Sequence, residues 1–87
     1  MKTIHKHILT NDKVILALPI GYEVFAVGGQ EGCAAMWVLG DVAETTVRVS
    51  FSLYGTGWDV PNTPGKYLGT CQLPPLVWHV FENGTLT

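Results

Sequence analysis

Five residues between positions 48 and 59 have side chains that could hold a ligand: Arg48, Tyr54, Thr56, Trp58 and Asp59. A guanidinium such as that of Arg48 binds phosphate or carboxylate through two parallel hydrogen bonds. The rings of Tyr54 and Trp58 could stack on a base, and each such stack is worth about 1–3 kcal/mol. Thr56 and Asp59 add groups that can hydrogen-bond a base or a ribose. Together these residues are candidates for a nucleotide-binding site.

Each of these residues also has a purely structural explanation. Arg48, the only arginine, could be a solvated charge on the polar face of a strand. Trp58 could pack over the end of the core or contact a partner, since tryptophan serves both purposes in proteins. Gly55 and Gly57 are not a phosphate loop, because no helix follows them. We expect these glycines to allow positive φ values or the close approach of another chain.

The histidines and cysteines give a weaker signal. His5 and His7 stand two residues apart on a predicted strand, so their side chains face the same way. With a third ligand such as His79 they could bind zinc or copper, but no closely spaced second pair completes a metal site. Cys33 and Cys71 lack a CxxC spacing, and we expect reduced thiols that pack as small apolar side chains. Without paired carboxylates or a nucleophile motif, the sequence predicts a non-enzymatic protein with no metal or other cofactor.

The composition indicates one small domain with uncovered apolar surface. The chain has 87 residues, of which 14% are charged and 47% are hydrophobic, whereas an ordinary soluble domain has about 25% charged residues. Because few charges leave apolar surface exposed, we expect a homo-oligomer. The net charge is −2 and the five basic residues form no run. This argues against sequence-independent binding of DNA or RNA, which needs many phosphate contacts.

The N-terminal stretch MKTIHKHILT has neither a long apolar core nor a small-residue cleavage site, so we do not expect it to act as a signal peptide. The longest apolar stretch, residues 14–20, contains Pro19 and is too short to span a bilayer. We therefore expect a cytoplasmic location and no contact with a membrane.

Gly and Pro recur at short intervals and separate apolar runs, which is typical of an all-β domain. Strict alternation over residues 45–54 predicts a strand with Val49 in the core and Arg48 on the polar face. The segment from Gly29 to Gly32 predicts a tight hairpin turn, and Trp37 and Trp78 are expected to pack in the core or against a sheet. About seven short, mostly antiparallel strands are predicted, over residues 2–9, 13–18, 23–28, 33–39, 45–54, 66–73 and 76–81. They favour a small sandwich or partly closed barrel over residues 1–82, followed by a C-terminal tail at 83–87.

Three stretches are similar to a known group of proteins: MKTIHKHIL, SFSLYGTGWDVP and YLGTCQLPPLVWHVFE. They resemble a family of short uncharacterised proteins, encoded mostly in bacteriophage and prophage genomes, with a KTIHK-like start, a GTG turn and a GTxQ…LVWHVFE end. The likeness covers nearly the whole chain except the segment 83–87. The family is a domain of unknown function, so the resemblance implies phage origin and transfers no catalytic residue.

Four hypotheses follow for the function. The first is a phage counter-defence protein that acts by binding in the host cytoplasm, in its favoured form an oligomeric sponge that sequesters a nucleotide immune signal. The second is an inhibitor that binds a host defence protein, with Trp58 as its anchor or with the strand at 2–9 adding to a partner's sheet. The third is a virion or assembly component. An enzyme that uses His5, His7 or His79 ranks last.

Overall fold

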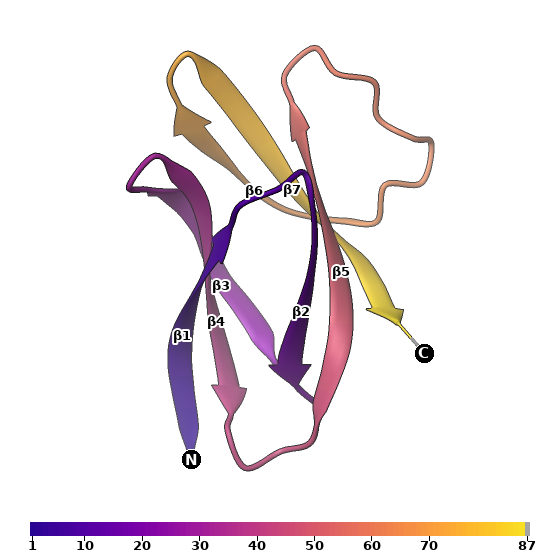
Figure 1. Ribbon diagram of the computed structural model, residues 1–87. Helices are drawn as coiled ribbons and strands as arrows, with labels where there is room; N and C mark the ends of the chain where they lie inside the picture. Colours follow the sequence, from indigo (N-terminus) through magenta and orange to yellow (C-terminus); the bar gives the residue numbers. More distant parts are fainter. Residues whose placement is uncertain (87) are drawn as a thin grey trace.

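The computed structural model describes residues 1–86, which form two antiparallel β-sheets packed face to face (Figure 1). The strands are β1 (Lys2–Leu9), β2 (Lys13–Pro19), β3 (Glu23–Gln30), β4 (Cys33–Asp41), β5 (Thr46–Gly55), β6 (Lys66–Leu73) and β7 (Leu76–Leu86). The predicted all-β class is confirmed, and the sheets form a sandwich that does not close into a barrel. The described part of the chain contains no helix that could cross a membrane.

One sheet has three strands in the order β1-β4-β3, and the other has four in the order β2-β5-β7-β6. The predicted hairpin is confirmed between β3 and β4. Its two turn residues, Glu31 and Gly32, have φ values of 53° and 78°, the positive pair that a type I′ turn requires. β1 and β2 are edge strands, each at the end of its own sheet.

The core lies between the two sheets and comes from residues that alternate along the strands. Its buried members are Leu9, Leu18, Ala34, Met36, Val38, Val49, Phe51, Leu53, Cys71 and Val80. Val49 and Phe51 are fully buried, which confirms the core face predicted for β5. Burying an aliphatic or aromatic side chain of this size contributes about 1.5–3 kcal/mol, so this layer holds the sheets together.

The two strand tryptophans have different positions. Trp78 packs against the core. Trp37 alternates with Met36 and Val38, which are core residues, so its ring lies on the outer face of the three-stranded sheet. There it packs over Gly28, where an added Cβ would stand 3.5 Å from the ring. One tryptophan therefore stabilises the core and the other covers the sheet from outside.

Residues 56–65 connect β5 to β6 and cross β7, because β7 lies between these two strands. Asn83 fixes this crossing. It is the extra residue of a β-bulge, since the pairing of β5 with β7 shifts register between Ser50 and Phe51. The amide oxygen of Asn83 accepts hydrogen bonds from Ser50 Oγ at 3.0 Å and Ser52 Oγ at 2.8 Å. Its Nδ2 donates to the carbonyl oxygen of Pro64 at 3.0 Å.

The C-terminal segment is part of the sheet over its described length. Residues 83–86, which the sequence suggested as a tail, form the end of β7, and Leu86 pairs with Arg48 of β5. Thr87 lies outside the described residues.

Candidate functional site

Four connections meet at one end of the sandwich, at the top of Figure 1. They are the β1–β2 turn at 10–12, the β3–β4 turn at 31–32, the β6–β7 turn at 74–75 and the start of the β5–β6 connection. The strand registers bring them together, because Leu9 pairs with Ala34 and Gly55 pairs with Trp78. Connections at one end of a rigid sheet are a common location for binding residues.

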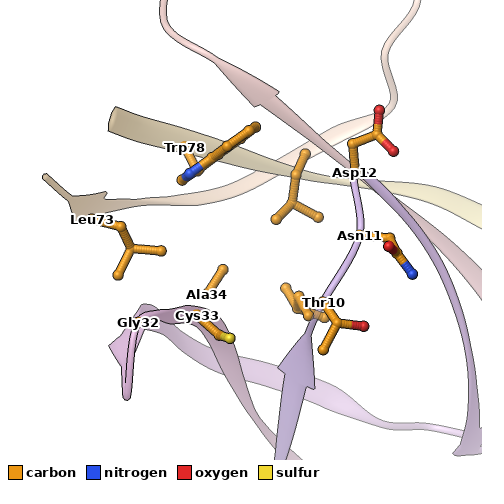
Figure 2. A pocket seen from close by; sticks show the side chains of 10 residues that line it. Thr10, Asn11, Asp12, Gly32, Cys33, Ala34, Leu73 and Trp78 are labelled. Atoms are coloured by element: carbon orange, nitrogen blue, oxygen red, sulfur yellow. The ribbon is translucent and has the colours of Figure 1, made fainter. Parts of the chain in front are cut away.

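An apolar pocket with a volume of about 190 Å³ opens at this end (Figure 2). Its lining is Leu9, Thr10, Asn11, Asp12, Gly32, Cys33, Ala34, Leu53, Leu73 and Trp78. In Figure 2, Trp78 and Leu73 lie on the side opposite Thr10 and Asn11. An apolar cavity of about 150 Å³ can hold benzene. The pocket is therefore large enough for one leucine or phenylalanine side chain of a partner.

Trp58 packs beside this pocket. Its ring meets that of Trp78 edge-on, with the centroids 4.9 Å apart and the planes at 82°. The indole also lies over Gly55, where an added Cβ would stand 2.8 Å from Nε1. The backbone N–H of Trp58 donates to the Gly55 carbonyl at 3.0 Å, and Gly57 has a φ of 91° in the same turn. Trp58 is nevertheless 47% exposed, so it both closes the end of the core and presents an aromatic surface.

A second hollow, of about 240 Å³, lies next to the first and shares Asp12 and Leu53 with it. Its lining also includes three of the predicted site residues: Tyr54, Trp58 and Asp59. The two hollows and Trp58 form one surface, which we call the Trp58 end.

The other two predicted site residues have different surroundings. Thr56 Oγ1 is 2.8 Å from His79 Nε2, and His79 Nδ1 is 3.0 Å from Thr70 Oγ1. This chain of contacts ties the start of the β5–β6 connection to β6. Arg48 is exposed near the other end of β5, about 20 Å from Tyr54 at roughly 3.3 Å per residue. The structure thus brings Tyr54, Trp58 and Asp59 together and leaves Arg48 apart from them.

Sequence reasoning missed Lys13, Asp12 and Trp78 as parts of this surface. Lys13 lines the second hollow together with Trp58 and adds a cation to it. It lies there because it pairs with Ser52 of β5, and this pairing joins strands that are far apart in the sequence. No local spacing could have indicated it.

The histidines do not form a common site. His5 and His7 line a hollow of about 190 Å³ between β1 and β2, on the shared face that the sequence predicted. Burial, and secondly the charge of His5, lower the pKa of His7. His79 belongs to the other sheet and contacts Thr56 and Thr70 instead. Among residues 1–86, no group of three or more His, Cys, Asp and Glu side chains could hold a metal ion.

Both cysteines are free thiols. Cys71 is buried in the core, and burial raises its pKa. Cys33 is half-buried and lines the apolar pocket. A raised pKa disfavours the reactive thiolate, which agrees with a packing role for Cys71.

Comparisons with known proteins identify the family of the chain. No curated protein and no solved structure matched it. A protein family described as a domain of unknown function, DUF7352, matches residues 1–86, the same range over which the sandwich is described. The chain belongs to the DUF7352 family.

Proposed function

We propose that this protein acts by binding a host protein in the cytoplasm of an infected bacterium and thereby inactivates a defence of that host. The phage setting rests on the resemblance of the three sequence stretches. The binding mode rests on one observation: an apolar pocket and a half-exposed tryptophan lie side by side at the Trp58 end. Tryptophan is enriched among the residues that dominate binding energy at protein interfaces.

The size of the hollows favours a protein target over a nucleotide. Sites that enclose small molecules usually have about 300–1,000 Å³, whereas the hollows of the Trp58 end have about 190 and 240 Å³. A volume of this size suits one inserted side chain. Arg48, the expected phosphate ligand, is too far from Trp58 for one mononucleotide to reach both.

A nucleotide sponge is the second candidate, and the position of Lys13 favours it. Lys13, Tyr54 and Trp58 line one hollow, so a cation and two aromatic rings are available to one ligand. A second chain would have to enclose that ligand. Under this alternative, Lys13→Ala abolishes binding of a cyclic dinucleotide probe, and the parent's affinity falls as salt rises. Arg48→Ala leaves that binding unchanged unless the second chain contributes its arginine.

The test is a plating assay with a phage that carries the gene. The phage is plated on a panel of strains, each with one defence system and otherwise isogenic. We expect the gene to restore plating on at least one strain, and Trp58→Ala to remove this effect. Ile15→Ala is the matched control, because Ile15 is 56% exposed on β2 and is not part of the Trp58 end. No restored plating on any strain, or full restoration by Trp58→Ala, would contradict the proposal.

A further inference from the structure

The outer face of the three-stranded sheet carries apolar side chains that nothing in residues 1–86 covers. On this face Ile4 pairs with Leu39, and Lys6 pairs with Trp37. Ile4 is 50% exposed and Ile8 is 36% exposed, while Trp37 and Leu39 are half-buried. We call this surface the β4 face, after its central strand.

The two borders of the β4 face carry opposite charges. β1 places Lys2 and Lys6 on this face and has no acidic residue. β3 places Glu23 on it, paired with Leu39, and has no basic residue. Asp41, at the end of β4, already accepts a hydrogen bond from the N-terminal ammonium at 3.2 Å. The face is thus apolar in the middle, with two lysines along one border and one glutamate, Glu23, on the other.

We propose that a second copy of this chain covers the β4 face, about a two-fold axis parallel to β4. Such an axis places β4 of one copy on β4 of the other, and β1 of each copy on β3 of the other. Rotation about it does not shift the two copies relative to each other along the strand direction. Glu23 and Ile4 are both level with Leu39. Glu23 of the second copy therefore lies above Ile4, between Lys2 and Lys6, each about 7 Å away along the strand. The apolar centres meet, and both pairs of charged borders are complementary.

The same axis has a consequence for recognition, which rests on the proposed function. Because the axis runs parallel to the strands, both Trp58 ends lie at the same end of the dimer. Two sites that face one way can engage a dimeric or repetitive target together, and such linkage can raise the apparent affinity 10²–10⁴-fold. The dimer itself does not depend on the proposed function.

Charge reversal tests the dimer by sedimentation velocity. Lys2→Glu/Lys6→Glu makes both borders acidic, and Glu23→Lys makes both basic. We expect each variant alone to dimerise at least tenfold more weakly than the parent at low salt. An equimolar mixture should recover the parent's affinity, because both borders of the mixed dimer are again complementary. Circular dichroism of each variant confirms that it is folded.

Substitution at the apolar centre provides a second test with a matched control. Ile4→Lys should be monomeric, whereas Ile15→Lys, at a similarly exposed position on the other sheet, should dimerise like the parent. A parent that stays monomeric at about 100 µM, where a moderate affinity would already show, would overturn the inference. So would a mixture no more associated than its components, or equal effects at Ile4 and Ile15. A dimer without activity in the plating assay would contradict only the proposed function.

Discussion

The indole of Trp58 stands edge-on against that of Trp78, with ring centroids 4.9 Å apart and planes at 82°. Trp78 is partly buried and packs against the core, whereas Trp58 is 47% exposed. This contact joins the core of the sandwich to its outer surface, and it orients the exposed half of Trp58. Trp58 is therefore both a structural lid and a candidate anchor for a partner. The two roles can be separated by measurement.

Replacement of the two tryptophans should have unequal effects on stability. Replacing a tryptophan that packs against the core by alanine costs about 3–5 kcal/mol, and we expect a loss of about 2 kcal/mol for Trp58, which is 47% exposed. Trp58→Ala should therefore lower the melting temperature by about 10 °C and leave a folded protein. Trp78→Ala should lower it considerably further. Thermal melting followed by circular dichroism gives both values, and equal losses would mean that Trp58 is as essential to the core as Trp78.

Gly55→Ala should displace Trp58 without altering the tryptophan itself. The new Cβ would stand 2.8 Å from Trp58 Nε1, so the indole has to leave its place on Trp78. We expect a change in the near-ultraviolet circular dichroism and loss of activity in the plating assay. Gly28→Ala is the control, because its Cβ would meet the Trp37 ring at 3.5 Å, an ordinary contact. A Gly55→Ala protein with the parent's spectrum and activity would contradict the described position of Trp58.

Much of the fold could be predicted from the sequence, because a strand with one buried face repeats every two residues. The predicted bounds of the strands at 2–9 and 66–73 agree with β1 and β6, and the core face of β5 was identified correctly. The tight turn at Glu31 and Gly32 was also predictable, since glycine-containing pairs favour such turns.

The spatial order of the strands was not predictable, and most of the site depends on it. Lys13 reaches the second hollow through its pairing with Ser52, and nothing near Lys13 in the sequence indicates that contact. The bulge at Asn83 depends on the register between β5 and β7. The sequence predicts Asn83 to lie in a tail, whereas in the structure it holds the β5–β6 connection through Pro64. Residue type and spacing place Arg48 in one predicted site with Tyr54, although the extended strand separates the two side chains.

Asn83 should hold the β5–β6 connection in a fixed conformation. Asn83→Asp keeps an oxygen that can accept from Ser50 and Ser52, but it loses the donor to Pro64 and places a carboxylate beside that carbonyl. We expect a loss of about 1–2 kcal/mol and faster hydrogen exchange within residues 56–65. Ser50→Ala, which removes one bond and keeps the Pro64 contact, is the control. Unchanged exchange in the Asn83→Asp protein would show that the connection is held by other contacts.

His7 should make the protein less stable in mild acid. Its pKa is lowered from 6.5 by burial and by His5, and the other residues that line its hollow are not ionisable. The unfolded chain then takes up a proton at a higher pH than the folded chain. Stability therefore falls as the pH drops through 6.5, and the loss continues until the folded pKa is passed.

His7→Gln removes this contribution. Between about pH 7.5 and 5.5 its melting temperature should fall less than that of the parent. His5→Gln is the comparison, because His5 is exposed and is only the secondary cause of the shift. Parallel melting curves for the parent and His7→Gln across this range would contradict the prediction.

The most direct test of recognition through the Trp58 end is a calorimetric titration of the defence protein that the plating assay identifies. The parent, Trp58→Ala, Arg48→Ala and Ile15→Ala are titrated at one temperature, at which all four are folded. An interface anchor is worth about 2 kcal/mol or more, so Trp58→Ala should weaken binding roughly thirtyfold. Arg48→Ala and Ile15→Ala should bind like the parent. Parent-like affinity of the Trp58→Ala protein would contradict the account.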